Sequence, residues 1–247
     1  MMGILANGPE AHDTELLAEL LRKSDKYSAL NFVKDVSVPK PVIHGDAERR
    51  IALIDCGAKL GIVRNLMRRG FQVVRVPYDS TYSTISKFDP AGVVISNGPG
   101  DPQMFHDTAK CVESLVDSDL PVLGICFGEQ ILGMSQGGRT FKLKYGHRGQ
   151  NKPCVDLTTG KGYVTSQNHG YALDPRSLSG SSLKPWFMNA DDKTVEGVFH
   201  ERRPCFAVQF HPEATPGPYD TNFVFDKFVE ACGRERKRGE QIRSVRA

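Results

Sequence analysis

Short apolar runs alternate with helix-length segments between residues 51 and 136, and this alternation constrains the fold more than any other feature. The apolar runs are rich in β-branched residues and cover 51–56, 71–76, 92–96 and 122–125, and the segments between them are 60–69, 81–88 and 104–117. Strands that alternate with helices form a parallel sheet covered on both faces. We therefore expect an α/β domain with a mostly parallel central sheet, whose ligand site lies beyond the carboxyl ends of the strands.

The pattern changes after Gly137, where short strand-like runs follow one another with turns between them. These runs cover 139–144, 162–168, 186–189, 194–199 and 205–210. Such a succession predicts a short antiparallel sheet. A last helix is expected from Asn222 to Cys232, and it closes the domain.

Cys126 stands at a junction between a predicted strand and a predicted helix. Gly124 and Gly128 flank it two residues away on either side. This is the form of a nucleophile elbow, because glycines there let the backbone bend sharply enough to expose one side chain. The helix N-terminus also stabilises a thiolate. Free cysteines are often inert core residues, so the pattern makes Cys126 a candidate nucleophile that needs a base.

His211 has the best setting for that base. It ends the strand-like run 206–210 and is followed by Pro212 and Glu213. Proline stops the strand, and an extended backbone places Glu213 on the same side as His211, where a carboxylate can orient the imidazole. His169 and His200 are the competing bases, and each could equally be an ordinary core or surface histidine.

The loop from Gly98 to Gly100 follows another predicted strand at the same edge of the sheet. Glycine–proline turns are usually only tight loops. Beside a nucleophile, a backbone N–H of Gly98 or Gly100, together with the N–H of Phe127, could form an oxyanion hole. Pro99 has no N–H and cannot take part.

Several motifs occur in an order that resembles one family. The pattern Gly-Ile-Cys-x-Gly-x-Gln, followed by His-Pro-Glu, is similar to the class I glutamine amidotransferases, α/β proteins with a flavodoxin-like fold. Within that family the chain resembles the small, glutamine-hydrolysing subunits of carbamoyl-phosphate synthetase. The resemblance covers about residues 50 to 230 and rests on Ser96-Asn97-Gly98-Pro99-Gly100-Asp101-Pro102, Lys142-Leu143-Lys144-Tyr145-Gly146-His147-Arg148-Gly149, Thr165-Ser166-Gln167-Asn168-His169-Gly170-Tyr171 and Pro216-Gly217-Pro218.

The resemblance implies an enzyme with a Cys126, His211 and Glu213 triad that converts L-glutamine to glutamate and ammonia through a cysteine thioester. Ammonia would pass to the synthetase large subunit, which would bind ATP and Mg; no cofactor is expected in this chain. Whether the product feeds arginine or pyrimidine synthesis stays open. The glutamine contacts implied by the resemblance are Gly98, Gly100, Phe127, Gln130, Asn168, Gly170 and Tyr171.

Two departures from the family pattern stand out. Glu129 occupies a position where many relatives carry histidine, and we expect its side chain to point away from the nucleophile. Family small chains also carry an N-terminal domain that contributes a serine to glutamine binding. We interpret 1–46 as the end of that domain with a linker, 50–233 as the amidotransferase domain and 234–247 as a basic tail.

Composition excludes several other classes of protein. Net charge is +3, but 234–247 holds six basic and two acidic residues, which leaves about −1 on 1–233, so no nucleic-acid surface is indicated. No apolar stretch is long enough to span a membrane and no signal pattern is present, so we expect a cytoplasmic protein. The six cysteines form no Cys-x-x-Cys pair, so neither a zinc site nor a disulfide framework is indicated, and the five other than Cys126 are predicted to be buried or incidental thiols.

Two alternatives to the main hypothesis remain. The chain could be a class I amidotransferase that supplies a different synthetase, although the Lys142–Gly149 and Pro216–Pro218 stretches argue against this. It could also be a catalytically weak binding subunit, because it lacks most of the N-terminal domain of its relatives.

Overall fold

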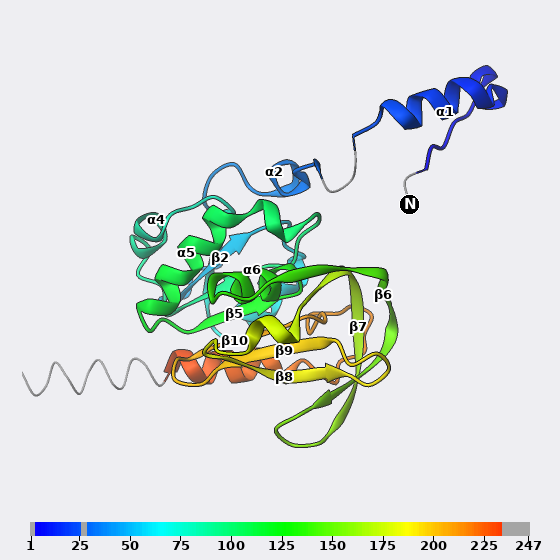
Figure 1. The fold of residues 1–247 in the computed structure, drawn as a ribbon. Helices are drawn as coiled ribbons and strands as arrows, with labels where there is room; N and C mark the ends of the chain where they lie inside the picture. Colours follow the sequence, from blue (N-terminus) through cyan, green and yellow to red (C-terminus); the bar gives the residue numbers. More distant parts are fainter. Residues whose placement is uncertain (1–2, 26–28, 234–247) are drawn as a thin grey trace, which may run out of the picture.

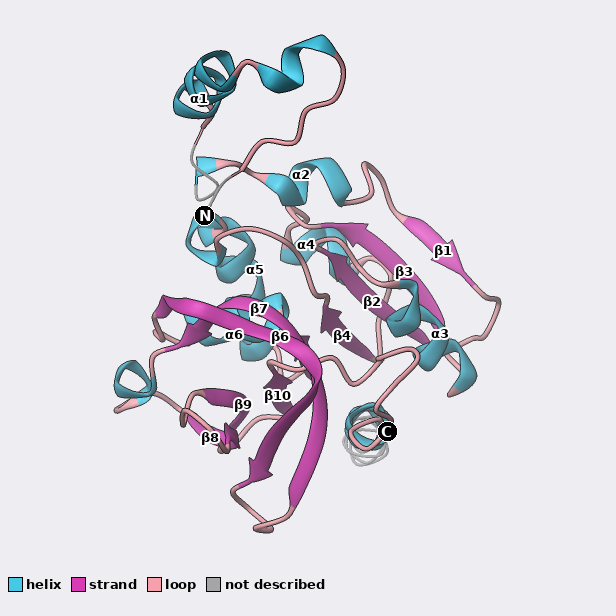
Figure 2. Ribbon diagram, turned by 90° about the vertical axis from the view of Figure 1, so that its right-hand side faces the viewer, coloured by secondary structure: helices cyan, strands magenta, loops and turns pink. Residues whose placement is uncertain are grey.

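A computed structural model of the chain describes residues 3–25 and 29–233, and the expected basic tail at 234–247 lies outside them. The described residues form one sheet of ten strands in the order β1-β3-β2-β4-β5-β10-β9-β8-β6-β7 (Figures 1 and 2). The strands are β1 (Val42–His44), β2 (Arg50–Asp55), β3 (Gln72–Pro77), β4 (Gly92–Ile95), β5 (Val122–Ile125), β6 (Thr140–Asp156), β7 (Gly162–Leu173), β8 (Leu183–Asn189), β9 (Val195–His200) and β10 (Cys205–Val208).

Helices occupy the three segments predicted between the strands, and others lie before β1 and after β5. They are α1 (Thr14–Lys23), α2 (Phe32–Val36), α3 (Leu60–Arg68), α4 (Tyr82–Ser86), α5 (His106–Asp117) and α6 (Phe127–Ser135), with short 3-10 turns at Pro9–His12, Pro102–Met104 and Pro175–Leu178. The chain is also helical over 223–233, where a closing helix was predicted.

The parallel part of the sheet has a hydrophobic core on each face. Strands β4 and β5 are fully buried and β2 is buried beyond Arg50, which is why their sequences are continuous apolar runs, whereas β3 is partly exposed at Gln72, Arg75 and Pro77. One core packs side chains of α4, α5 and α6 against the sheet, and the other packs α3 and the helix over 223–233. The predicted α/β domain with helices on both faces is confirmed.

The antiparallel strands extend the parallel sheet instead of forming a separate one. Strand β10 pairs in parallel with β5 along one edge and antiparallel with β9 along the other. Both edges of β10 are therefore hydrogen-bonded, and the sheet continues through β9, β8, β6 and β7. Strands β6 and β7 are much longer than predicted, and Figure 2 shows them as a long twisted ribbon. Their full length was not predicted because polar residues and glycines interrupt the alternating apolar pattern that indicates a strand.

The N-terminal segment stands away from the sheet. Helix α1 is N-capped by Asp13, whose side chain accepts a hydrogen bond from the Leu16 N–H, but none of its residues is buried (Figure 1). The interpretation of 1–46 as part of a further domain stays a prediction.

The carboxyl ends of three parallel strands meet at one edge. Register pairs Ile54 of β2 with Ile95 of β4, and Ile95 with Gly124 of β5. The loops that follow begin at Cys56, Ser96 and Cys126, so segments far apart in the sequence converge there.

Candidate active site

Cys126 adopts the backbone conformation of a nucleophile elbow. It is the N-cap of α6, with φ of 55° and ψ of −102°, a strained region for a residue that is not glycine. A Cβ atom on Gly124 would lie within 3.0 Å of the Gly128 carbonyl oxygen, and a Cβ atom on Gly128 would lie within 3.0 Å of the Ile95 carbonyl oxygen. Both glycines are therefore required by close packing, and the turn they permit presents the thiol at the sheet edge.

His211 and Glu213 lie together as their spacing predicted. His211 Nδ1 is 2.8 Å from Glu213 Oε1, and the two residues are 7% and 2% exposed. Burial alone lowers the pKa of His211, but the Cys126 sulfur, which it contacts by a side-chain hydrogen bond, and the Glu213 carboxylate together raise it to about 10. Burial raises the pKa of Glu213, yet the His211 hydrogen bond and charge bring it below the usual value.

One cavity of about 1020 Å³ contains the elbow. Every residue predicted from the sequence lines it except Glu213, which lies behind His211. These lining residues are Gly98, Gly100, Cys126, Phe127, Gln130, Asn168, Gly170, Tyr171 and His211. The structure thus brings the predicted set to a single place.

Sequence reasoning missed several polar residues of this cavity. Lys59 lines it, and its Nζ is 3.5 Å from Glu213 Oε1. Its position just after β2, at the same sheet edge as the other loops, is the signal that could have revealed it. Ser166, Lys142 and Arg148 also line the cavity from β6 and β7; they belong to motifs of the resemblance, which implied no glutamine contact for them.

The glycine loop is held in place by its neighbours. A Cβ atom on Gly98 would meet the backbone of Cys56, and Gly100 has a φ of 97°, which favours glycine. The Cys56 N–H donates to Ser96 Oγ and the Lys59 N–H donates to Asn97 Oδ1. The N–H of Phe127 belongs to the first turn of α6, where helical acceptors are absent.

The family model named Glutamine amidotransferase class-I matches residues 52–231. The chain belongs to the class-I glutamine amidotransferase family.

Within this family, the chain is similar to proteins named carbamoyl phosphate synthase small chain. It is 50% identical over 220 residues to the carbamoyl phosphate synthase small chain of Methanopyrus kandleri, a match that covers 89% of this chain and 60% of the relative. It is 46% identical over 229 residues to the small chain of Sulfolobus acidocaldarius, covering 92% and 60%. The chain thus spans about 60% of the length of these curated relatives.

Solved structures support the fold. A Thermoplasma acidophilum protein assigned to GMP synthase matches with a TM-score of 0.67 and 24% identity, over 80% of this chain and 100% of its own. A glutamine amidotransferase from Thermotoga maritima matches with a TM-score of 0.54 and 18% identity, over 79% of this chain and 86% of its own. Within the described residues, none of the helices has the length and apolar character of a membrane span.

Neither competing histidine is placed like His211. His169 lines the amidotransferase cavity, but its Nδ1 donates to the Tyr171 carbonyl at 2.8 Å, and burial lowers its pKa. His200 lies in a different cavity, and its Nδ1 accepts from the N–H groups of Arg202 and Arg203. Burial lowers the pKa of His200 as well.

Glu129 of the amidotransferase is fully buried in the first turn of α6. Within the described residues, neither of its carboxyl oxygens has a hydrogen-bond partner. Burial raises its pKa well above the usual value, and the charges of Glu196 and Cys126 raise it further. Burial and these neighbouring charges therefore favour the protonated, uncharged form of this carboxyl group.

The remaining cysteines behave as predicted. Cys56, Cys111, Cys154, Cys205 and Cys232 are free and buried, and burial raises the pKa of each thiol. In contrast to Cys126, they do not line the amidotransferase cavity.

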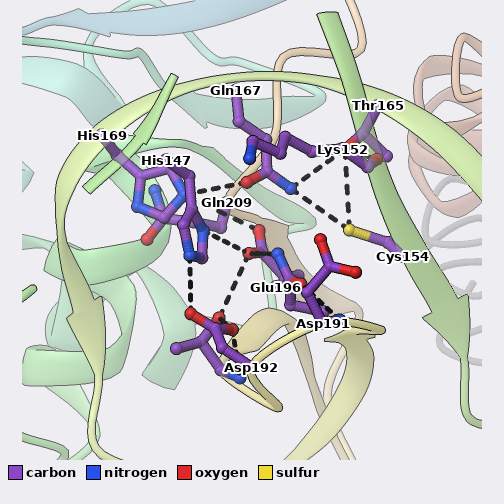
Figure 3. A network of polar contacts seen from close by, with 12 residues as sticks. His147, Lys152, Cys154, Thr165, Gln167, His169, Asp191, Asp192, Glu196 and Gln209 are labelled. Atoms are coloured by element: carbon purple, nitrogen blue, oxygen red, sulfur yellow. Dashed lines mark hydrogen bonds and ion pairs between the residues drawn. The ribbon is translucent and has the colours of Figure 1, made fainter. Parts of the chain in front are cut away.

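A buried polar network lies beside the cavity (Figure 3). His147 Nε2 is 2.8 Å from Asp192 Oδ2, and His147 Nδ1 is 3.0 Å from Glu196 Oε1. The Glu196 hydrogen bond is the main cause that raises the pKa of His147, and it outweighs burial, which lowers this pKa. One ligand atom each of His147, His169 and Glu196 lie within 4.8 Å of one another, a spacing compatible with a metal ion, but hydrogen bonds already occupy both nitrogens of His147.

Proposed function

We propose that this chain is the glutamine-hydrolysing part of a carbamoyl-phosphate synthetase, and that it releases ammonia for the large subunit. The observation that carries the proposal is the arrangement of Cys126, His211 and Glu213 at one cavity, with a strained elbow under the thiol. Sequence identity of 40–50% to proteins named carbamoyl phosphate synthase small chain supports the synthetase large subunit as the partner.

Glutamine would enter with its side-chain amide toward Cys126. Gln130 and the strand residues Asn168, Gly170 and Tyr171 line the cavity and offer amide and backbone groups to the charged end of the ligand. Lys59 and Arg148 add positive charge to the cavity wall, which favours a ligand that carries a carboxylate.

In the first step the Cys126 thiolate attacks the amide carbon and a C–S bond forms. The oxyanion would receive hydrogen bonds from the Phe127 N–H and from the Gly98–Gly100 loop. His211 uses Nδ1 to contact Glu213, so its Nε2 is the atom that gives a proton to the departing nitrogen. The C–N bond breaks, ammonia leaves, and a γ-glutamyl thioester remains.

In the second step water cleaves the thioester. His211 Nε2 takes a proton from the water as its oxygen bonds to the acyl carbon, and the C–S bond then breaks to regenerate the thiolate and release glutamate. Glu213 stabilises the charged imidazolium in both steps.

The proposed partner is the synthetase large subunit, which would hold ATP, Mg and bicarbonate. The proposed compartment is the cytoplasm. Ammonia would have to reach the partner by a sheltered path, because in bulk water it would be protonated and lost as a nucleophile.

Glutamate release tests the proposal. The purified chain is incubated with L-glutamine, both by itself and with the large subunit of a carbamoyl-phosphate synthetase, and glutamate and carbamoyl phosphate are measured. Cys126-dependent glutamate release coupled to carbamoyl phosphate supports the proposal. Glutamate release that never couples to the large subunit would instead point to another synthetase, and no release under either condition would contradict an enzymatic role.

A further inference from the structure

The Tyr171 carbonyl oxygen joins two elements of the glutamine cavity. It accepts a hydrogen bond from Gln130 Nε2 at 2.9 Å and another from His169 Nδ1 at 2.8 Å. Gln130 comes from α6, one turn beyond the nucleophile, and His169 and Tyr171 come from β7. Gln130 Nε2 also donates to Gln209 Oε1 at 2.9 Å, so the Tyr171 carbonyl is one of two acceptors that set the position of the Gln130 side chain.

The β6–β7 ladder is interrupted at this point. Lys142 pairs with Tyr171 and His147 pairs with His169, so residues 143–146 of β6 stand opposite Gly170 alone. Regular backbone pairing does not hold β7 at the position where the cavity needs it. Side chains have to supply that rigidity, and His147 is the first ladder residue beyond the interruption.

His147 packs directly against His169. The two rings meet edge to face with centroids 4.8 Å apart and an interplanar angle of 83°. His169 Nε2 is 3.3 Å from Gln167 Oε1 and 3.8 Å from Glu196 Oε2. The orientation of His169 thus depends on His147 and Glu196, both of which are outside the substrate cavity.

The β8–β9 hairpin fixes His147 from the other side. Glu196 of β9 accepts hydrogen bonds from His147 and from Asn189 Nδ2, and Asp192 accepts from the N–H and hydroxyl of Thr194. Figure 3 shows Asp192 and Glu196 converging on the His147 ring. We refer to His147, Asp192 and Glu196 as the His147 cluster.

We propose that His147 is a positioning residue for glutamine binding: the His147 cluster holds His169 and the Tyr171 carbonyl, and through them Gln130, in the geometry that accepts the amino-acid end of the substrate. The inference rests on the proposed function, because it concerns the same cavity. It assigns a role to a histidine that touches neither substrate nor nucleophile.

The test compares His147→Asn with His200→Asn, a matched change of a buried histidine on β9 outside this cavity. Two reagents are used on each full-length variant: iodoacetamide, which needs only an accessible Cys126 thiolate, and a chloroketone analogue of L-glutamine, which must also bind through its amino-acid end. We expect His147→Asn to lower the rate with the chloroketone about tenfold, the affinity equivalent of about one hydrogen bond, and to leave the iodoacetamide rate unchanged.

Steady-state kinetics gives a second readout. KM for glutamine should rise about tenfold in His147→Asn while kcat stays within roughly twofold, the pattern of lost binding rather than lost chemistry. Asp192→Asn removes the carboxylate of a half-exposed member of the cluster, so this variant should fold. We expect a smaller rise in KM for glutamine, again with little change in kcat.

Three outcomes would overturn the inference. Equal loss with both reagents would mean a general disturbance of the elbow, and an unchanged chloroketone rate would mean that the cluster plays no part in binding. A stoichiometric metal ion found in the wild-type chain but not in His147→Asn would mean that these residues form a metal centre and not a hydrogen-bonded cluster. The reagent rates do not depend on turnover, so failure of the proposed hydrolysis would be seen separately as absent glutamate release.

Discussion

His211 Nδ1 lies 2.8 Å from Glu213 Oε1, two residues further along the chain. Pro212 and Glu213 lie in a turn closed by the hydrogen bond from the Ala214 N–H to the His211 carbonyl, so a turn brings the pair together rather than the extended backbone expected from the sequence. The contact has a consequence for the charge of His211, because a buried carboxylate favours the imidazolium over the neutral ring.

Glu213→Gln should shift the alkaline limit of glutamine hydrolysis. Cys126 makes the larger contribution to the raised pKa of His211, and the variant keeps an oxygen that can accept from Nδ1 but loses the further contribution of the Glu213 charge, so this pKa should fall. The imidazolium that protonates the leaving nitrogen is then lost at a lower pH. The pH profile of kcat measures this, with exposed Glu201→Gln as the control. An unshifted alkaline limb would show that Glu213 does not set the charge of His211.

Cys126→Ser should abolish glutamate release and covalent trapping of glutamine. A hydroxyl at this position is far less acidic than a thiol and has no base strong enough to ionise it. Intact-mass measurement after incubation with glutamine detects the thioester in the wild type. In a complex with the large subunit, the ammonia-dependent reaction should survive, because ammonia generation alone needs the thiolate. Glutamine-dependent synthesis at the wild-type rate would refute the nucleophile.

His211→Asn should lose at least about two decades of glutaminase activity, the usual contribution of a general acid–base group. His200→Asn should retain activity, because His200 lies in another cavity and contacts backbone N–H groups of Arg202 and Arg203. Circular dichroism of both variants checks that they fold. Should His200 be essential and His211 dispensable, the assignment of the base is wrong.

Glu129→Gln should stabilise the protein at high pH. The folded state raises the pKa of Glu129, so the folded chain retains a proton that the unfolded chain loses above the ordinary value of 4.5. Stability therefore falls as pH rises from that value toward the raised pKa, and an uncharged amide avoids the loss. Denaturant titrations at about pH 4 and about pH 8 should show a gain for the variant at the higher pH only. A gain of equal size at both values would point to a packing effect.

Gly128→Ala should destabilise the elbow. The added Cβ would fall against the Ile95 carbonyl of the neighbouring strand, and overpacking of this kind costs about 1–3 kcal/mol. Gly162→Ala is the matched control, because no atom lies within 4 Å of its added Cβ. Chemical denaturation of both variants measures the difference. A Gly128→Ala protein as stable as the control would mean that strand and helix can separate without cost.

The sequence by itself determined the local features of this protein. Apolar runs alternating with helical segments indicated the parallel core, because a strand buried on both faces must be apolar throughout. The flanking glycines indicated the elbow at Cys126, and the His-Pro-Glu spacing indicated the contact between His211 and Glu213, because both depend on residues only one or two positions apart.

Tertiary structure alone decided which distant residues complete the site. The sequence expectation that Glu129 points away from the nucleophile did not reveal that burial raises the pKa of its carboxyl, nor that Glu196 from a distant strand raises it further. Lys59 reaches Glu213 across the sheet edge, and His147 meets Asp192 and Glu196 from another hairpin. Such contacts depend on the strand order and on the register of β6 with β7. The sequence does not determine that register, because β6 and β7 are polar, their pairing is interrupted by register shifts, and no alternating apolar face specifies which residues pair.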